Sequence, residues 1–494
     1  MDQAHKKDHF NLRAFGSDVL VYSFGQILLL IFGLIQSLII PKYLPTADYG
    51  YWQLFLLYTA YVGILHFGFL DGILVRWAGR EFKEIRPEVP AAFRFLLLEQ
   101  FLIVGILGLV LVAINFPSLD VALAVLANGI IVNFLMFFTF TAQAVKQFKL
   151  VTAANISKGA IFLLLVLGLF FGGVFGYKYL YIATIVAGTV ILILLIVYLR
   201  DSLFSQTTCT KSLWGYGKEN ISIGVFVLLS NFITILLMTI DRLTVGSFFT
   251  ITQFAQYTFA ISMCTIVVAF VSAVSQVFFP YLSESSPKTR IRAYQLLKPV
   301  VIIFWAGALV MYFPFTTWVN FYLPDYTPSL PIVAILLCMM GFSSQIQILH
   351  LNFFKAYHEQ RLYFTLAGLS LVCAVVLYLL AAKLFGTLVS IAIMAVISSL
   401  LWYLFNEFSL HRFVSMDGNW KATVRWLLVI GTYAGAFLAT CGLVQNWIYG
   451  TVIYLTIFIL VTSTVLKPDV ISLVNMVRAA MNQTGDINGL RTQK

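Results

Sequence analysis

Charged residues are scarce in this chain. Only 10% of its 494 residues are Asp, Glu, Lys or Arg, whereas a soluble globular protein has about 25%. The mean hydropathy is +0.93, and apolar residues make up 61% of the sequence, against about 45–50% in soluble domains. So few charges cannot coat a water-soluble globule of this length, and an array of soluble domains is excluded.

Cysteines and catalytic motifs are also scarce. Four of the five cysteines lie inside apolar runs and no CxxC pair occurs, so neither a disulfide framework nor a metal site is predicted. The chain has no phosphate-binding P-loop, no HExxH zinc motif and no GxSxG nucleophile motif. We therefore expect neither an enzyme nor an ATP-driven pump, and no cofactor.

Long apolar runs occur along the whole chain instead. Many have the roughly 18–25 residues that are needed to cross the hydrocarbon core of a bilayer. The predicted fold class is an all-α polytopic membrane protein with fourteen transmembrane helices. The expected spans are 17–40, 49–75, 92–115, 119–143, 150–172, 179–199, 218–240, 252–278, 293–314, 328–353, 362–382, 386–405, 422–444 and 447–466.

The distribution of Lys and Arg predicts how these spans are oriented. With both termini in the cytoplasm, 27 of the 31 cations fall on the cytoplasmic side, as the positive-inside rule requires. The outer side then receives only Lys42, Lys178, Arg242 and Lys383. The net charge of +11 is spread over many separate segments, which favours contact with anionic lipid over nucleic-acid binding.

A weak internal repeat divides the chain into two lobes. Residues 143–150 and 355–362 resemble each other at an offset of 212, Tyr49 pairs with Tyr257 at 208, and Gly176 pairs with Gly386 at 210. Because this offset passes six spans, the two halves share one orientation, which predicts a parallel repeat. We expect lobes at 1–205 and 206–412, an extra helix pair at 413–466, and a cytoplasmic interfacial helix and tail at 467–494.

Polar residues inside several spans recur at helical spacing, which places them on shared faces. They either line an aqueous cavity between the lobes or form hydrogen bonds between packed helices. The candidates for contact with a substrate are Gln26, Gln36, Thr59, His66, Asn231, Thr234, Ser262, Thr265, Ser272, Gln276 and Gln347.

Charged side chains near or within spans form a second group of candidates. Arg76 and Lys158 suit a substrate phosphate, although Lys158 can also snorkel to the interface and Arg76 can pair with Asp71. Asp71, Asp241, Arg242 and His350 are the candidates for coupling or gating. For His66 and His350 a proton relay and an ordinary core histidine both remain open.

Several short motifs resemble those of a known family. They are PKYLPTADYG at 41–50, Phe67-Gly68-Phe69, Gly72-Ile73, Arg76, and Ile240-Asp241-Arg242 followed by Tyr257. They resemble bacterial polysaccharide transporters, the O-antigen and capsule flippases of the multidrug/oligosaccharidyl-lipid/polysaccharide exporter superfamily. Unlike the lipid II flippases of that superfamily, the chain has no arginine cluster in its first span.

This resemblance implies a function and a set of partners. The cargo would be a polyprenyl-pyrophosphate-linked oligosaccharide, moved from the cytoplasmic to the outer leaflet of the inner membrane by alternating access. The extra helix pair would offer a groove for the lipid tail. Net export would then need either coupling to an H+ or Na+ gradient or consumption of the product downstream. The polymerase and glycosyltransferases of the same pathway are candidate partners.

Two other functions remain as alternatives. One is a cation-coupled multidrug or small-molecule exporter of the same superfamily, which the absence of an acidic residue in the middle of the first six spans disfavours. The other is a membrane glycosyltransferase or ligase, which would need a large catalytic outer loop that the expected connections do not provide.

Overall fold

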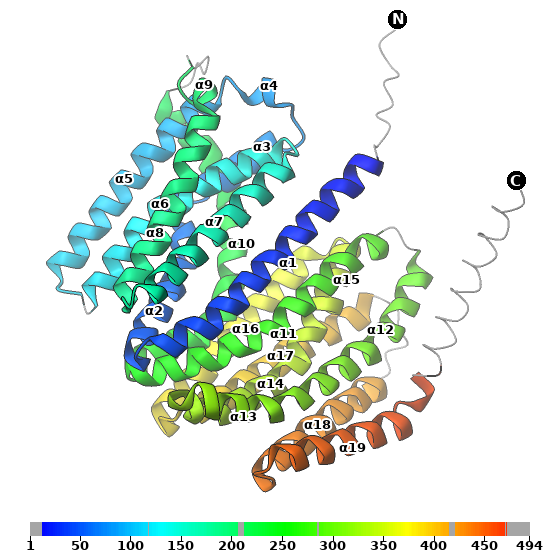
Figure 1. Cartoon of the computed structure of the whole chain (residues 1–494). Helices are drawn as coiled ribbons and strands as arrows, with labels where there is room; N and C mark the ends of the chain where they lie inside the picture. The colour runs from blue at the N-terminus through cyan, green and yellow to red at the C-terminus, as the bar shows by residue number, and fades with distance from the viewer. Residues whose placement is uncertain are drawn as a thin grey trace, which may run out of the picture. The chain divides into compact units, whose positions relative to one another are not determined.

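The computed structural model describes residues 12–116, 118–205, 212–283, 286–413, 420–469 and 471. All regular secondary structure in these ranges is helical (Figure 1), which confirms the predicted all-α class. The chain forms two compact units, 1–236 and 237–494. The boundary between them lies inside α10, Leu213–Phe248, and the expected division into lobes at 205/206 stays a prediction.

The first unit contains nine helices besides the N-terminal part of α10, among the residues that the structure describes, together with a short 3₁₀ segment, η1. Their bounds are α1 Leu12–Tyr43, α2 Thr46–Thr59, η1 Val62–His66, α3 Phe69–Trp77, α4 Phe82–Ile85, α5 Val89–Ala113, α6 Leu119–Ala144, α7 Phe148–Phe171, α8 Tyr177–Tyr198 and α9 Arg200–Leu203.

The second unit continues from α10 with α11 to α19 and contains the 3₁₀ segments η2 and η3 and the π-helical segments η4 and η5. Their bounds are α11 Ile251–Ser283, α12 Pro287–Ala308, η2 Leu309–Met311, α13 Tyr312–Tyr322, η3 Pro324–Ser329, α14 Leu330–Gln345, η4 Ile346–His350, α15 Leu351–Ala356, α16 Gln360–Leu380, η5 Ala381–Phe385, α17 Leu388–Phe413, α18 Trp420–Leu443 and α19 Trp447–Thr464.

The length and hydropathy of these helices confirm a multi-pass membrane protein. Within the described ranges, eleven helical segments are long and apolar enough to cross a bilayer, and α2–η1 with α3 adds a bent twelfth. The two remaining expected spans, 17–40 and 252–278, coincide with α1 and α11, whose side chains are described only in part. The count of fourteen therefore stays a prediction.

The expected span over 49–75 is not one uninterrupted helix, because this segment bends by 64°. Phe67 and Gly68 both have left-handed backbone conformations, with φ values of 43° and 88°, and two such residues in succession cannot continue a right-handed helix. The backbone N–H of Gly68 donates a 3.2 Å hydrogen bond to Nδ1 of His66, which stabilises the bend. His66 and Asp71 consequently lie on opposite sides of a break.

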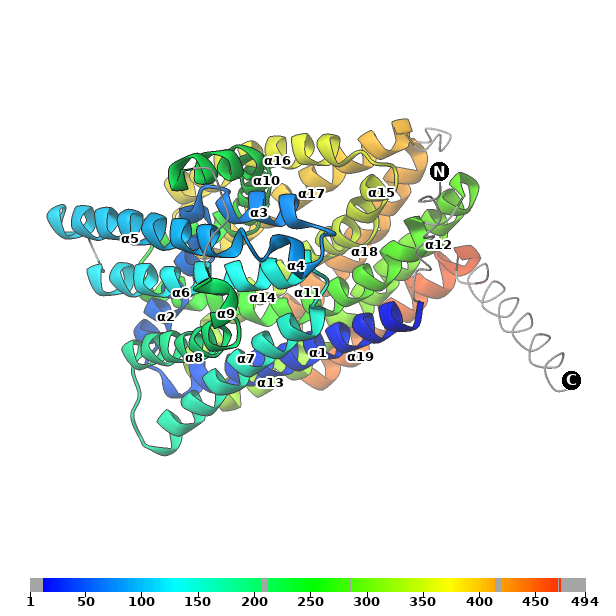
Figure 2. The same ribbon diagram turned by 90° about the horizontal axis from the view of Figure 1, so that it is seen from above.

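In the first unit, α6 is the central helix and packs against α3, α5 and α8. The buried core beside it is rich in aromatic side chains, including Phe69, Trp77, Phe95 and Phe137. The helix α7 lies along α1 (Figures 1 and 2). This close packing is possible because Gly25 and Gly159 face Thr152 and Phe32 across the helix pair.

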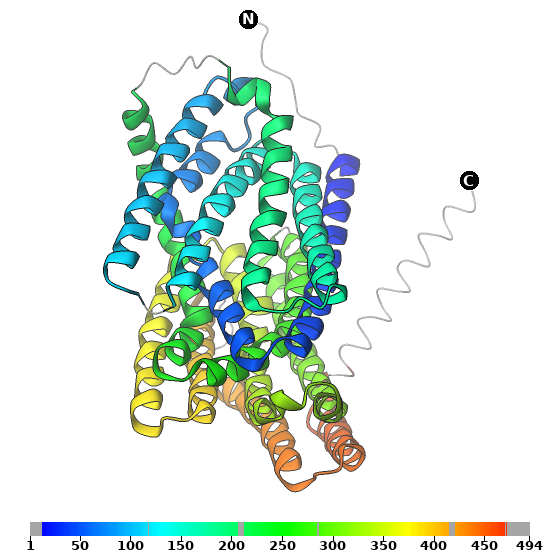
Figure 3. The ribbon, with the colours of Figure 1, turned by 60° about the vertical axis from the view of Figure 1, so that its left-hand side comes forward.

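In the second unit, α14 is the most buried of the eleven spanning segments and packs against α11 and α17. The helices α18 and α19 form a hairpin at the C-terminal end of the described chain (Figure 3). The hydroxyl of Tyr454 on α19 donates a 3.0 Å hydrogen bond to the carbonyl of Ala306 on α12. This contact ties the hairpin to the rest of its unit.

Glycines allow α3 and α10 to cross at very short range. A Cβ atom added to Gly72 would lie 1.9 Å from the carbonyl oxygen of Asn220, and one added to Gly224 would lie 1.9 Å from that of Gly68. Both obstacles are backbone atoms, which cannot turn away as a flexible side chain would. The crossing therefore requires the absence of a side chain on each helix.

We predict that Gly72→Ala and Gly224→Ala each lower the thermal stability of the purified protein in detergent. In an ordinary helix the same change stabilises by about 1 kcal/mol, whereas overpacking at this crossing costs about 1–3 kcal/mol or more. Gly105→Ala in α5 is the control, because nothing lies within 4 Å of its added Cβ. A Gly72→Ala protein as stable as the control would show that the crossing is not tight.

Candidate substrate groove and interior polar sites

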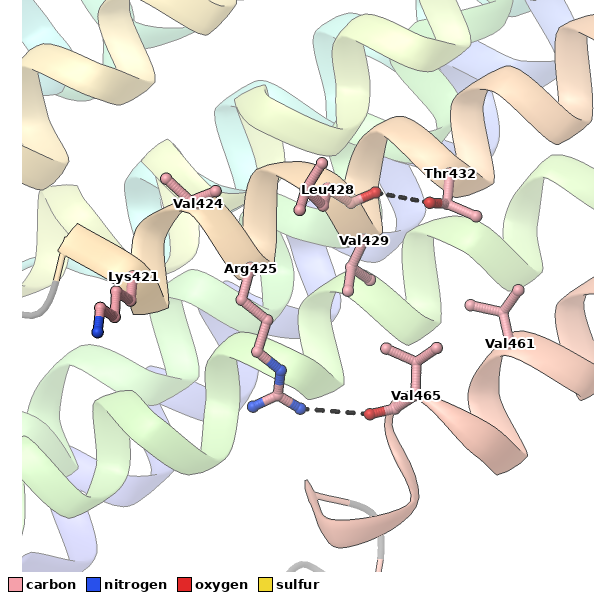
Figure 4. A pocket seen from close by; sticks show the side chains of 8 residues that line it. All are labelled: Lys421, Val424, Arg425, Leu428, Val429, Thr432, Val461 and Val465. Atoms are coloured by element: carbon pink, nitrogen blue, oxygen red, sulfur yellow. Dashed lines mark hydrogen bonds between the residues drawn. The ribbon is translucent and has the colours of Figure 1, made fainter.

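An apolar groove lies between α18 and α19. The hairpin around it is fixed by a 2.9 Å hydrogen bond between the hydroxyls of Tyr433 and Thr462 and by Asn446, whose side chain caps the first turn of α19. The groove has a volume of about 380 Å³. Its lining residues, shown in Figure 4, are Lys421, Val424, Arg425, Leu428, Val429, Thr432, Val461 and Val465.

Two cations lie at the end of this groove where α18 begins. Arg425 donates a 3.3 Å hydrogen bond to the carbonyl of Val465 (Figure 4) and forms a 2.5 Å ion pair with Asp469. Lys421 is exposed and has no acidic partner among the residues whose contacts are described. The groove thus combines walls that suit a hydrocarbon chain with side chains that suit an anionic head group.

The sequence contains a signal for this groove that a search for polar stripes misses. Lys421, Arg425, Leu428 and Thr432 are spaced 4, 3 and 4 apart, which places them on one helical face. A search for polar residues inside spans passes over three of these four positions, because Lys421 and Arg425 lie at the end of a span and Leu428 is apolar. The resemblance predicted a groove in this helix pair but did not indicate its residues.

Arg76 lies in an ion-pair network at the end of α3. Its guanidinium is 3.2 Å from a carboxylate oxygen of Glu88 and 3.5 Å from one of Glu219. Glu88 also accepts a 3.3 Å hydrogen bond from Trp77 Nε1 and another of 3.3 Å from the Tyr216 hydroxyl. Arg76 therefore does not pair with Asp71, because its guanidinium is already paired with the carboxylates of Glu88 and Glu219.

Asp71 faces His66 instead. Both side chains are buried, and Nε2 of His66 is 3.9 Å from Oδ2 of Asp71. The bend at Phe67 and Gly68 creates this contact, since it turns the first residues of α3 back towards the end of η1. An uninterrupted helix would place residues 66 and 71 on different faces.

Lys158, unlike Arg76, forms no ion pair with a described residue of the first unit. It is half-buried about three turns into α7. Among the described residues it has neither an acidic partner nor a hydrogen bond. Its positive charge is therefore available to an anion, although the structure also allows the stem to snorkel.

A buried carboxylate lies in the first unit, contrary to the sequence-based expectation. Glu99 is 9% exposed and sits near the middle of α5, and its Oε2 atom has no hydrogen-bond partner in the described part of the chain. The neighbouring Gln100 donates to the carbonyl of Leu65 and accepts from Asn133. The absence of a mid-span acid can therefore not be used against an ion-coupled exporter.

Asp241 and Arg242 lie in the second-unit part of α10. Asp241 is buried and accepts a 2.9 Å hydrogen bond from the hydroxyl of Tyr257. The guanidinium of Arg242 donates to the carbonyl of Met238, one turn earlier. His350 lies in a different cluster, where its Nε2 is 2.9 Å from a carboxylate oxygen of Glu407.

For the remaining candidate residues, contact with a substrate stays a prediction. The hydroxyls of Thr234, Ser262 and Thr265 each donate to the carbonyl four residues earlier, while the buried Thr59 Oγ1 has no partner among the described residues. Gln36 and Gln347 are half-buried and Asn231 is exposed. The side chains of Gln26, Ser272 and Gln276 lie outside the described residues.

Comparison with known proteins identifies the fold. No protein-family model and no curated protein matches the sequence, but solved structures do. A structure of the lipid II flippase MurJ in an inward closed conformation matches with a TM-score of 0.68 and 10% identity, over 92% of this chain and 100% of that one.

Multidrug transporters match over less of the chain. An inward-facing MATE family transporter of the MOP superfamily gives a TM-score of 0.60 at 14% identity, over 79% of this chain and 96% of that one. A MATE transporter of Vibrio cholerae gives 0.50 at 15% identity, over 81% and 96%. The chain is a polytopic membrane protein with the fold that these transporters and flippases share.

Proposed function

We propose that the chain is a flippase for a polyprenyl-pyrophosphate-linked oligosaccharide in the synthesis of O-antigen, capsule or another surface polysaccharide. It would move this substrate from the cytoplasmic to the outer leaflet of the inner membrane by alternating access. The observation that carries the proposal is the groove between α18 and α19, with apolar walls and with Lys421 and Arg425 at one end.

The groove has the chemistry of a lipid-linked anion. A polyprenyl chain gains free energy from apolar walls that are long enough to cover it, and a pyrophosphate requires cations or hydrogen-bond donors where the dielectric constant is low. In the proposed topology α18 begins on the cytoplasmic side, so Lys421 meets the head group in the leaflet where the substrate is made. Arg425 would join it by exchanging the carboxylate of Asp469 for the pyrophosphate.

The structural comparisons are compatible with a lipid-linked substrate. The matched flippase structure covers 92% of this chain, whereas the MATE structure covers 79%. The flippase is described as acting on lipid II, which is itself lipid-linked. The absence of arginines in the first span still favours a different head group for this chain.

Filling the groove tests the proposal directly. We predict that Thr432→Trp lowers the affinity of the purified protein for a synthetic polyprenyl pyrophosphate by about tenfold or more, because the indole occupies the space of the chain. Thr456→Trp on α19 is the matched control. Both threonines are exposed and both donate a 2.8 Å hydrogen bond to the carbonyl four residues earlier, but only Thr432 lines the groove.

Native mass spectrometry in lipid nanodiscs measures this binding, and co-purified lipid-linked sugars identify the head group. Equal binding by the two tryptophan variants would refute the groove as the lipid site. If wild-type protein binds no polyprenyl pyrophosphate, the proposed substrate class is wrong.

Lys158 is the favoured cation for the head group in the first unit. Arg76 is already neutralised by Glu88 and Glu219, so a phosphate would have to displace a carboxylate there. A charge-assisted hydrogen bond contributes about 1.5–3 kcal/mol, which corresponds to roughly tenfold or more in an equilibrium constant.

We predict that Lys158→Met lowers surface polysaccharide by about tenfold in cells with normal membrane abundance of the protein, and that Lys158→Arg retains most of it. Lys149→Met, which removes an exposed cation from the first turn of the same helix, serves as the control. Normal export by Lys158→Met would leave snorkelling as the role of Lys158.

Glu99 favours a second candidate function, a cation-coupled exporter of multidrug or small-molecule substrates. A buried carboxylate with an unpartnered oxygen can exchange a proton or hold a cationic solute. This function predicts efflux of a lipophilic cation such as ethidium by the wild-type chain and loss of that efflux in Glu99→Gln. Ethidium retention equal to that of cells without the protein would exclude it.

A further inference from the structure

The carboxylate of Glu407 on α17 is the centre of a polar cluster inside the second unit. Its Oε1 atom forms an ion pair with the ammonium of Lys298 and lies 3.2 Å from Nε2 of His411. Its Oε2 atom lies 2.9 Å from Nε2 of His350 and accepts a 2.6 Å hydrogen bond from the hydroxyl of Tyr294. Four donors thus surround one carboxylate.

This cluster is deeply buried in membrane-spanning segments. Glu407 is 1% exposed, Lys298 3% and His350 0%, and they come from three different spanning segments. Charged groups in such surroundings are rare, costly and usually functional. A structural ion pair could be replaced by apolar side chains of similar volume without loss of stability, so packing alone does not account for these residues.

Each of the two histidines has a ring nitrogen that can bind a proton. Each turns its Nε2 atom towards the carboxylate, so a neutral ring that donates there carries its lone pair on Nδ1. The Nδ1 atoms of His350 and His411 are buried and have no hydrogen-bond partner among the described residues. A proton that binds at one of them produces an imidazolium beside the carboxylate.

A metal cation fits this cluster poorly. The groups that point at Glu407 are N–H and O–H donors, whereas Na+ and similar hard cations require several oxygen acceptors. The ammonium of Lys298 already occupies the position that a cation would take beside Oε1. Among the described residues no group of His, Cys, Asp and Glu side chains is arranged to hold a metal ion.

The backbone beside the cluster is irregular, and a buried polar side chain next to it lacks a hydrogen-bond partner among the described residues. His350 ends the π-helical segment η4, in which the N–H of Leu351 donates to the carbonyl of Ile346, five residues earlier; such segments are frequent at functional sites. The side-chain amide of Asn406 is buried without a hydrogen-bond partner in the described part of the chain. Unsatisfied buried groups of this kind require an explanation.

The most exposed member of the cluster, His411, connects the buried carboxylate with the protein surface. The side chain of His411 is 18% exposed, whereas those of His350 and Glu407 are 0% and 1% exposed. His411 also lies 3.1 Å from the hydroxyl of Thr423 on α18. It is one α-helical turn beyond Glu407, near the end of the span that the proposed topology places in the cytoplasm.

We propose that Glu407, Lys298, His350 and His411 form a proton-binding site, and that binding and release of the proton couple transport to the proton gradient. The site itself is independent of the cargo, while the coupling rests on the transport function proposed above. Protonation at a histidine weakens the hold of Lys298 on the carboxylate, because two cations then share one negative charge. The contacts that join α12, η4 and α17 change as a result.

The groups that face this site come from every element packed around it. Helix α12 contributes Lys298 and Tyr294, and η4 contributes His350. Helix α17 contributes His411 and Tyr403. The ring centroid of Tyr403 is 5.2 Å from the ring centroid of His350 and 5.5 Å from the ammonium of Lys298. The neighbours without a titratable group are Gln345 of α14 and Thr423 of α18.

The composition of the chain makes a direct test possible. It has only six histidines, so the ring nitrogens of histidine-labelled full-length protein in liposomes can be resolved by solid-state NMR. His350→Gln and His411→Gln assign the two signals, and His358→Gln, at an exposed position outside the cluster, is the control. We expect one of the two rings to gain a proton between about pH 8 and pH 5 and Glu407→Gln to shift that transition.

A charge-neutral double variant separates coupling from stability. Glu407→Gln alone leaves a buried cation without its partner, which is strongly destabilising, whereas Lys298→Met with Glu407→Gln removes both charges. We expect the double variant to regain thermal stability but to export at least about tenfold less surface polysaccharide than wild type. Glu359→Gln, in the loop before α16, serves as the control for loss of a carboxylate.

Two results would overturn the inference. One is that both rings keep a single protonation state throughout the pH range. The other is that the stable double variant exports at the wild-type level, since the cluster would then only hold the helices together. If the wild-type protein proves not to handle a lipid-linked sugar, the proposed function fails while the ring titration still tests the proton site.

Discussion

The free-energy cost of a polar group in hydrocarbon is the constraint on which this structure depends. Within the spans every charge must meet an opposite charge, a set of hydrogen-bond donors or an aqueous surface. Arg76 meets Glu88 and Glu219, and Lys298 meets Glu407. The same constraint makes the exceptions informative, because a side chain such as Lys158 that lacks an acidic partner within the described residues needs something else to neutralise it.

Two polar sites of the second unit therefore differ in kind. The carboxylate of Glu407 is buried and surrounded by donors from side chains of its own unit, which suits a proton that enters through a histidine. The groove at Lys421 and Arg425 is open and apolar along its walls, which suits a ligand that stays partly in the bilayer. The proposed flippase would use both kinds of site if a proton gradient drives it, since binding of the cargo has no direction unless a gradient or a later reaction supplies one.

Hydropathy and cation asymmetry were sufficient to predict helices, their approximate ends and a multi-pass fold. The break at Phe67 and Gly68 was missed because both flanks are equally apolar, and only the left-handed backbone of two adjacent residues reveals it. Glu407 was missed for another reason. Its partner Lys298 is 109 residues away, and a carboxylate at a span end looks like an interface residue until the fold brings that ammonium to it.

The fold does not decide the substrate, since structures described as a lipid II flippase and as multidrug transporters both match it. The distinction must come from the sites. Glu99 suits an ion or a cationic solute, and the groove of α18 and α19 suits a chain of hydrocarbon with an anionic end. These features are compatible in one molecule if Glu99 serves coupling and the groove serves cargo. The proposed flippase function rests on the groove, because an exporter of free solutes has no need for an apolar groove with cations at one end.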